Sequence, residues 1–222
     1  MDPDSVRHRR SAGDGHGTDV ALVRADDLDL MAVARLRRLG PGARALDLGC
    51  GHGGQAVRMA ETGATVVACD LHDFAAAIAQ RAAGLANPPI FLRCDARALP
   101  PDFGGGEFDV VISQRMIHYL RFDEAVATLR RLRALMRPGA RLYLSASGLR
   151  SELGEGYPHR DLPLERRFAP LSEPMRRKHR IHPPVCLYER DDLARLLTDA
   201  GYRVEALFVS PFGNVKAAAA LD

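Results

Sequence analysis

The sequence of 222 residues contains no tryptophan, and aromatic residues make up only 6% of it. Side chains that could stack on nucleic-acid bases are therefore scarce. The chain has 31 basic and 28 acidic residues. The resulting charge of +3 does not by itself indicate a nucleic-acid partner, and we expect none. Two of the basic residues are lysines, Lys178 and Lys216.

Cysteine is also scarce, because Cys50, Cys69, Cys94 and Cys186 lie far apart and form no C-x-x-C pair. This spacing argues against a disulfide framework and a zinc site, so we expect no metal and a reducing, cytoplasmic environment. No apolar run approaches the roughly 18–20 residues that a membrane-spanning helix needs. The polar start of the chain lacks the apolar core of a secretory signal peptide.

Hydrophobic residues, 46% of the chain, follow a regular pattern. Residues 1–18 are polar and glycine-rich, and we expect a flexible tail there, followed by one domain at 19–222. Helical spacing over 26–39 predicts an N-terminal helix, after which short apolar strands alternate with helices. The expected strands are 43–49, 65–70, 90–94, 108–113 and 140–147, and the expected helices are 53–62, 74–85, 123–136 and 189–201.

Two more expected strands, 202–210 and 214–220, end the chain. The connection between them is too short for a parallel crossover, so this pair is antiparallel. The whole pattern predicts an α/β fold with a doubly wound, seven-stranded sheet, mostly parallel with an antiparallel last strand. Residues 148–187 hold six prolines without a sustained period. We expect a lid-like insert there, because long irregular segments in compact domains are usually functional.

The most informative motif is D-L-G-C-G-H-G-G at 47–54, where the first strand ends and a helix begins. Glycines let the backbone turn sharply and approach a ligand closely. The second strand ends in Asp70, where a carboxylate can accept hydrogen bonds from both hydroxyls of a ribose. Together these features predict a site for an adenosine-type cofactor at the carboxyl ends of the strands.

The glycine motif alone leaves two classes open, because Gly49, Gly51 and Gly54 also satisfy the G-x-G-x-x-G pattern of a dinucleotide-dependent oxidoreductase. Three features favour another class: Asp47 within the strand end, Asp95 after the third strand, and the final antiparallel pair. With them, the chain from about residue 26 onward resembles the class I S-adenosyl-L-methionine (SAM)-dependent methyltransferases. Their usual pattern is D/E-x-G-x-G-x-G, followed by acids after the second and third strands.

The resemblance implies SAM as the cofactor and assigns roles by position. It implies that the methionine part of SAM is surrounded by Asp47, Gly49, Gly51 and Gly53, with Gln114 beneath the methionine and the methyl group. It also implies that Asp70 holds the ribose, that Leu71 packs on the adenine, and that Asp95 and Ala96 bind the adenine. Asp95 could instead only cap the turn that follows it.

Candidates for the acceptor side lie in the segment S-Q-R-M-I-H-Y-L at 113–120, directly after the fourth strand. If this segment is helical, His118 shares a face with Gln114, and its near-neutral pKa makes it our candidate catalytic base. Local packing of His118 is the alternative. Arg115 and Tyr119 are candidate substrate-binding residues. The segment lacks the Asn/Asp-Pro-Pro-Tyr/Phe motif common in enzymes of this superfamily that methylate nucleic-acid amino groups.

The densest basic run of the chain, residues 176–180, lies in the expected insert. A solvated surface is the default interpretation. A clamp for an acidic small molecule, with Arg177 binding a carboxylate, is the second, and a contact with RNA is the third. Asn214 and Lys216 on the last strand could face the same pocket, although we expect Lys216 at the surface.

These patterns predict an enzyme: a SAM-dependent methyltransferase that acts on a small-molecule acceptor and releases S-adenosylhomocysteine (SAH). An acidic, carboxylate-bearing metabolite is the candidate acceptor. Three alternatives stay open, namely a dinucleotide-dependent oxidoreductase, an RNA methyltransferase and a non-enzymatic SAM-binding module. The acceptor itself is not encoded in these motifs, because acceptor pockets are built from variable loops.

Overall fold

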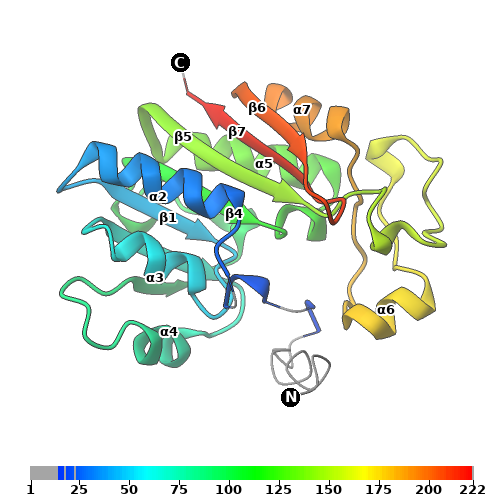
Figure 1. Ribbon diagram of the computed structural model, residues 1–222. Helices are drawn as coiled ribbons and strands as arrows, with labels where there is room; N and C mark the ends of the chain where they lie inside the picture. Colours follow the sequence, from blue (N-terminus) through cyan, green and yellow to red (C-terminus); the bar gives the residue numbers. More distant parts are fainter. Residues whose placement is uncertain (1–14, 18, 23, 222) are drawn as a thin grey trace.

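The computed structural model describes residues 15–17, 19–22 and 24–221, and Figure 1 shows a sheet flanked by helices. The strand order is β3-β2-β1-β4-β5-β7-β6. The strands are β1 (Arg44–Leu48), β2 (Thr65–Asp70), β3 (Ile90–Arg93), β4 (Phe108–Gln114), β5 (Met136–Ala146), β6 (Arg203–Val209) and β7 (Val215–Ala220). Strands β1 to β5 pair in parallel, whereas β7 runs antiparallel to both β5 and β6. The predicted seven-stranded sheet is confirmed.

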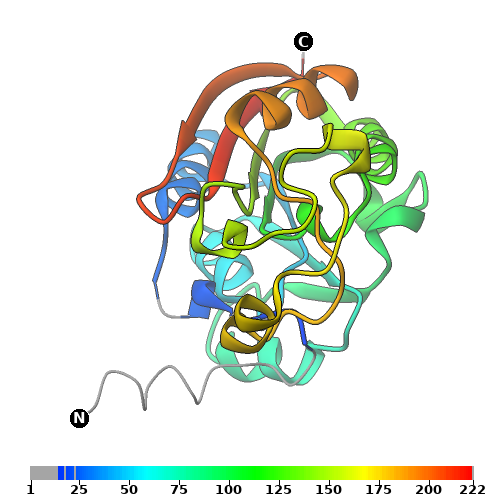
Figure 2. The same cartoon turned by 90° about the vertical axis from the view of Figure 1, so that its right-hand side faces the viewer.

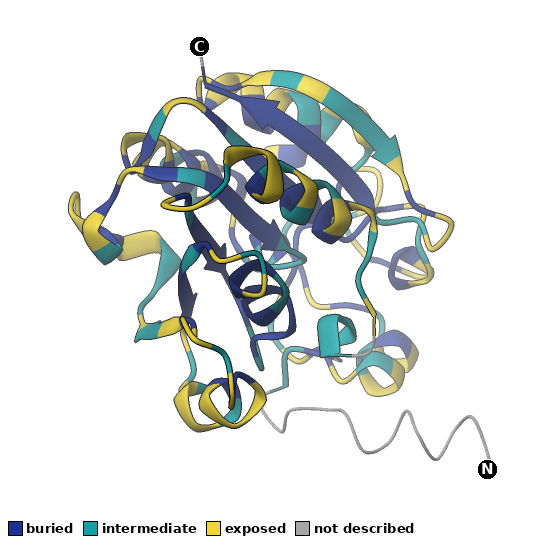
Figure 3. Ribbon diagram, turned by 60° about the vertical axis from the view of Figure 1, so that its left-hand side comes forward, coloured by how far each residue is buried: buried dark blue, intermediate teal, exposed yellow. Residues whose placement is uncertain are grey.

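Helices cover both faces of this sheet. The helices are α2 (Asp27–Leu39), α3 (Gly54–Ala60), α4 (Ala75–Arg81), α5 (Phe122–Ala134), α6 (Glu173–His179) and α7 (Arg190–Asp199). Ala45 of β1 packs in one core cluster with Leu28 of α2, and the next residue, Leu46, packs in the other cluster with Leu129 of α5. Because side chains alternate along a strand, both faces of the sheet are buried at its central strands, which Figure 3 colours largely dark blue. The edge strands β3 and β6 are only partly buried.

The predicted N-terminal helix is α2, and Asp26 caps it. The Asp26 carboxylate accepts hydrogen bonds from the main-chain N–H groups of Leu28 and Asp29. In return, the Asp29 carboxylate accepts one from the N–H of Asp26, which completes a capping box. This cap fixes where the helix begins, above the carboxyl ends of the central strands.

Two local details differ from the sequence analysis. The first is the start of the fifth strand, expected at residue 140, because β5 already begins at Met136, which pairs with Phe108 of β4. The second concerns residues 113–120, where the helix that was considered does not form. Here β4 extends to Gln114, Arg115 adopts a positive φ of 53°, and only a short 3-10 turn, η4 (Ile117–Tyr119), follows. Gln114 and His118 therefore do not share a helix face.

The segment 148–187, which Figure 2 shows from the side, is more ordered than its sequence suggests. It contains η5 (Glu152–Gly154), η6 (Leu164–Arg166) and α6. Nine of its residues form a core cluster of their own: Leu149, Leu153, Tyr157, Ala169, Leu171, Met175, Ile181, Val185 and Leu187. Apolar burial, rather than helical or strand periodicity, holds this segment together.

Most of the expected flexible tail, residues 1–14 and 18, lies outside the described residues. Residues 15–17 do not behave as a free tail. The N–H of His182 donates to the carbonyl of Gly15 (2.9 Å), and the N–H of Gly17 donates to the carbonyl of Arg180 (3.1 Å). Their contact with residues 180–182 places them against the segment 148–187. Among the helices of the described chain, none is long and apolar enough to cross a membrane.

Candidate cofactor and acceptor site

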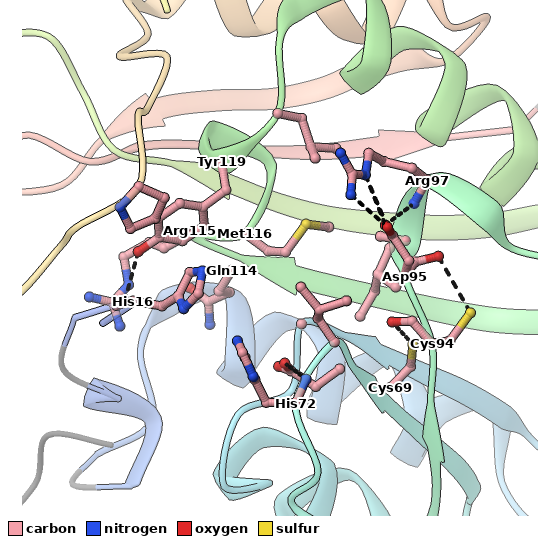
Figure 4. Close-up of a pocket in the computed structure, with 17 residues that line it drawn as sticks. His16, Cys69, His72, Cys94, Asp95, Arg97, Gln114, Arg115, Met116 and Tyr119 are labelled. Atoms are coloured by element: carbon pink, nitrogen blue, oxygen red, sulfur yellow. Dashed lines mark hydrogen bonds and ion pairs between the residues drawn. The ribbon is translucent and has the colours of Figure 1, made fainter. Parts of the chain in front are cut away.

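A pocket lies at the carboxyl ends of the central strands, where β1 neighbours both β2 and β4. This is the switch point at which doubly wound folds bind ligands. Of the residues predicted for the site, the pocket is lined by Gly49, Asp70, Leu71, Asp95, Ala96, Gln114, Arg115 and Tyr119. The other predicted residues, Asp47, Gly51, Gly53, His118 and Arg177, do not line it. Figure 4 shows the side chains from the different strands converging.

The glycine loop between β1 and α3 shapes one wall of the pocket. Gly49, Gly51 and Gly53 all have positive φ, at 77°, 51° and 80°. A Cβ atom on Gly49 would lie 2.6 Å from the Cβ of Met116, and one on Gly53 would lie 2.5 Å from Ile78. The loop therefore requires glycine for both its backbone angles and its close contacts. Gly51 and Gly53 shape the loop without lining the pocket.

Asp70 connects this loop to the end of β2. Its Oδ2 accepts a hydrogen bond from the N–H of Gly51 (3.0 Å), and its Oδ1 accepts one from the N–H of His72 (3.1 Å). The carboxylate is thus held in place from both sides, and each oxygen keeps a further lone pair. Leu71, beside it, leaves 48% of its surface exposed. Such a half-exposed apolar side chain on a pocket wall can cover a planar ring.

Asp95 follows β3 and lies next to Ala96 in the pocket wall. Its carboxylate caps the turn η2 (Ala96–Ala98) by accepting from the N–H of Arg97 (2.9 Å). The guanidinium of Arg97 donates to it as well (2.7 Å), and this hydrogen bond is the main cause that lowers the pKa of Asp95. The capping role considered from the sequence is therefore present, while the carboxylate also lines the pocket.

Asp47, in the middle of β1, has no exposed surface. Burial raises the pKa of its carboxyl group well above the ordinary value, and the negative charges of Asp29, Asp19 and Asp70 add to that rise. The structure places this residue behind the glycine loop. A direct contact of Asp47 with a ligand in the pocket is therefore not supported by its position.

Gln114, at the end of β4, takes part in a polar network behind the pocket. Its side-chain Nε2 donates to Oε1 of Gln55 (2.5 Å) and to Oδ1 of Asp26 (3.1 Å). Asp26 in turn accepts from the Nζ of Lys216 (2.8 Å). The expected surface position of Lys216 is wrong, because only 4% of the residue is exposed. Asn214 does not line the pocket either.

His118 is buried beneath the pocket wall, with 1% of its surface exposed. Its Nδ1 accepts a hydrogen bond from the N–H of Ser147 (3.4 Å). Burial is the main cause that lowers its pKa to about 3, and the charges of Arg115 and His16 lower it further. A general base works best with a pKa near the working pH and within reach of the proton it removes. Position and pKa both favour a structural role for His118.

His16, which was not predicted as a site residue, lines the pocket although it belongs to the expected tail. Its ring lies 5.1 Å from that of His72 and 5.0 Å from that of Tyr119, measured between ring centroids. The hydroxyl of Tyr119 donates to the carbonyl of His16 (2.6 Å). No local pattern predicts this arrangement, because it depends on where the segment before α2 packs. Arg115 completes this polar end of the pocket.

Arg177, predicted to bind a substrate carboxylate, points into solvent from α6. Its side chain is 79% exposed, and its Nε is paired with Glu173 (2.6 Å). The neighbouring Arg176 pairs with the same carboxylate, and Lys178 pairs with Glu152. The exposed, paired position of Arg177 does not support the predicted clamp, and much of the basic run is already neutralised. Within the described part of the chain, no group of three potential metal ligands occurs.

The chemistry of the pocket fits SAM. One end carries two carboxylates, Asp70 and Asp95, which suit the ribose hydroxyls and the adenine amino group. Leu71 and Ala96 supply apolar surface for the ring, and the bare backbone at Gly49 leaves room for close approach. These groups come from three successive strand ends, which is the order that the sequence motifs implied.

Comparisons with known proteins agree with this fit. Residues 45–139 match a family model described as a methyltransferase domain. A ubiquinone biosynthesis O-methyltransferase from Xanthomonas campestris pv. campestris is 33% identical over 109 residues, which are 47% of this chain and 43% of that protein. The match thus spans less than half the length of this curated relative.

Among solved structures, a 1,6-didemethyltoxoflavin-N1-methyltransferase from Burkholderia thailandensis, with bound SAH, is 25% identical. The likeness covers 88% of this chain and 79% of that one, with a TM-score of 0.62. An S-adenosylmethionine-dependent methyltransferase from Clostridium acetobutylicum shares the fold at 12% identity, with a TM-score of 0.67 over 87% of this chain and 90% of that one. The match to a methyltransferase domain over residues 45–139, the sheet topology and the likeness to the SAH-bound structure together support a class I SAM-dependent methyltransferase.

Proposed function

We propose that this protein transfers a methyl group from SAM to a small-molecule acceptor that carries an acidic group, and releases SAH. The observation that carries the proposal is the division of one pocket into two ends. Figure 4 shows Asp95 on one side of the pocket and Arg115, Tyr119 and His16 together on the other. We assign Asp95 and Asp70, which also lines the pocket, to the adenosine end. A cationic and hydrogen-bonding second end suits an anionic acceptor.

At the adenosine end, the residues bind and orient. Asp70 is held by two backbone N–H groups and offers its remaining lone pairs to the ribose hydroxyls. Asp95, fixed by Arg97, accepts from the adenine amino group, and Leu71 covers the ring. When bound, SAM supplies an activated methyl group, so that the protein contributes mainly alignment.

At the acceptor end, Arg115 supplies a fixed positive charge. Its left-handed backbone, with φ at 53°, follows directly on β4 and turns the chain at the pocket wall. We propose that its guanidinium holds the acidic group of the acceptor and that the Tyr119 ring packs beside the acceptor. His118 was predicted to be the catalytic base, but its burial and its low pKa argue against that role. An acceptor that is already ionised at its reacting atom needs no such base.

The alternatives have less support. Residues 45–139 match a methyltransferase domain rather than a dinucleotide-binding one. An RNA acceptor would use the basic run at 176–180, but Arg176, Arg177 and Lys178 are engaged with Glu173 and Glu152. A non-enzymatic SAM-binding module would keep the cofactor site and lack turnover, which makes turnover the deciding measurement.

The first experiment is calorimetric titration of the purified chain with SAM, SAH and NADH. We expect micromolar binding of SAM and SAH and no binding of NADH. Asp70→Ala is the matched variant, and it should weaken SAM binding by about 1–3 kcal/mol, because ribose hydroxyls lose their partner. Binding of NADH alone would overturn the proposal.

The second experiment detects SAH formation with a panel of acidic metabolites, each paired with its neutral amide or ester. Turnover of the acid and not of its neutral partner supports an acidic acceptor. Equal turnover of both would refute the acidic group while leaving methyl transfer in place. Binding of SAM without turnover of any acceptor in a broad panel would favour the binding module.

A further inference from the structure

Lys216 is a buried cation close to the pocket, although it does not line it. It lies on β7, and its side chain is only 5% exposed. Its Nζ donates to Oδ2 of Asp26 (2.8 Å) and to Oδ2 of Asp27 (3.3 Å). A buried ammonium without such partners would be strongly destabilising. The ion pair therefore connects the last strand to the beginning of α2, 190 positions earlier in the chain.

Asp26 uses its two oxygens for different partners. Oδ2 accepts from Lys216, whereas Oδ1 accepts from the N–H groups that begin α2 and from Nε2 of Gln114 (3.1 Å). Lys216 and the helix cap together fix the rotation of the carboxylate, so that Oδ1 faces Gln114. The hydrogen bond from Lys216 also contributes to the lowered pKa of Asp26, which keeps the carboxylate ionised.

Only one orientation of the Gln114 amide allows hydrogen bonds to both of its neighbours, Asp26 and Gln55. An ionised carboxylate can only accept hydrogen bonds, so the amide nitrogen of Gln114 must face Asp26. The same nitrogen donates to Oε1 of Gln55, and both of its hydrogens are then used. What Gln114 has left for a ligand in the pocket is its carbonyl oxygen, which is an acceptor only.

We propose that Lys216 and Asp26 are positioning residues that orient the Gln114 amide, so that its carbonyl oxygen accepts from the ammonium group of the cofactor's methionine end. This inference rests on the proposed function, because it assumes that SAM and SAH occupy the pocket. The new element is that recognition of the ammonium group of SAM and SAH depends on the Lys216–Asp26 ion pair, which lies outside the pocket. If the Gln114 amide were flipped, so that its oxygen and nitrogen exchanged places, it would present N–H groups to a cation.

The test measures the dissociation constants of SAH and of 5′-methylthioadenosine, which carries the adenosine but no ammonium group. In Lys216→Met, the carboxylate of Asp26 loses its anchor. We expect SAH to bind about tenfold more weakly, which is the scale of one charge-assisted hydrogen bond. Binding of 5′-methylthioadenosine should stay within about twofold, which also shows that the variant is folded. Lys216→Arg keeps a cation and should recover most of the SAH affinity.

A double-mutant cycle tests whether Asp26 acts through Gln114. Asp26→Asn keeps a good helix-capping residue but removes the charge, so it isolates the electrostatic role. We expect Asp26→Asn and Gln114→Ala each to weaken SAH binding, and the double variant to be no weaker than Gln114→Ala alone. Fully additive losses would refute the positioning role.

Two further outcomes separate this inference from the function on which it rests. Unchanged SAH affinity in Lys216→Met and Asp26→Asn, with 5′-methylthioadenosine still bound, would overturn the inference and leave the cofactor assignment in place. Equal weakening of both ligands would also overturn it, since the ion pair would then support the whole site. A wild-type chain that binds neither ligand would refute the proposed function itself.

Discussion

The hydroxyl of Tyr119 donates a hydrogen bond of 2.6 Å to the main-chain carbonyl of His16, across 103 positions of the sequence. This bond attaches the segment before α2 to the turn after β4. Because both residues line the pocket, the start of the described chain forms part of the site wall. The order of this segment and the shape of the acceptor end are therefore coupled.

Tyr119→Phe removes that hydrogen bond while keeping the ring. We expect the free energy of unfolding to fall by about 1 kcal/mol, the typical contribution of one such bond. The KM of the acceptor should rise more than that of SAM, because the change is at the acceptor end. Urea unfolding and steady-state kinetics check the two effects. An acceptor KM equal to that of the wild type would show that the segment at His16 does not shape the acceptor site.

Gly49→Ala tests the close contact in the glycine loop. The new Cβ would meet the Cβ of Met116, which cannot move without its backbone. Gly139→Ala is a matched control, since Gly139 also has positive φ (76°) but nothing lies within 4 Å of a Cβ there. Backbone strain alone should cost Gly139→Ala about 1 kcal/mol of stability. We expect Gly49→Ala to lose more and to bind SAH at least tenfold more weakly. Equal SAH affinity in both variants would argue against a tight loop at Gly49.

His118 should make stability depend on pH. Its pKa is about 3 in the folded protein, against about 6.5 in the unfolded chain. The unfolded chain therefore binds the proton more readily as the pH falls below about 6.5, and the folded state loses stability until the pH reaches about 3. Between pH 7 and pH 5 this single group should cost about 2 kcal/mol.

The measurement for His118 is urea unfolding of the wild type and of His118→Gln at pH 7 and pH 5. All other titrating groups are common to both proteins, so the difference between their pH slopes isolates His118. We expect the wild type to show the steeper loss. Identical slopes would mean that His118 is not held neutral by burial, which would restore it as a candidate base.

Arg115 and Arg177 form a matched pair for the acidic acceptor. Both were expected to bind substrate, but only Arg115 lines the pocket, while Arg177 is paired with Glu173 at the surface. Arg115→Ala should raise the KM of an acidic acceptor at least tenfold, as expected for the loss of a charge-assisted contact. Arg177→Ala should leave that KM unchanged. The reverse pattern would place the acceptor under α6 instead.

Much of the cofactor end could be predicted from the sequence, for a physical reason. Asp70 and Asp95 each follow a strand, and parallel strands bring their carboxyl ends to one edge of a sheet. Once the alternation of strands and helices is recognised, these acids and the glycine loop must lie near one another. The antiparallel final pair followed from a connection too short to cross the sheet.

Residues at the acceptor end could not be placed in this way. A turn at Arg115 stands where a helix over 113–120 was considered, and it buries His118 instead of presenting it to the pocket. His16 reaches the pocket only because residues 15–17 pack against the segment 180–182. These placements depend on contacts between distant parts of the chain, which leave no periodic signal in the sequence.

The sheet, the cofactor loop and the acids at the strand ends follow from the sequence, because local periodicity and short connections constrain them directly. Which side chains face the pocket and which stand behind it depends on contacts between distant parts of the chain. Lys216 illustrates the difference. A lysine is expected to be a solvated cation, yet β7 lies beneath the beginning of α2, so that Lys216 forms an ion pair with Asp26. A buried charge is stable only where the fold supplies its partner, and that partner comes from the other end of the chain.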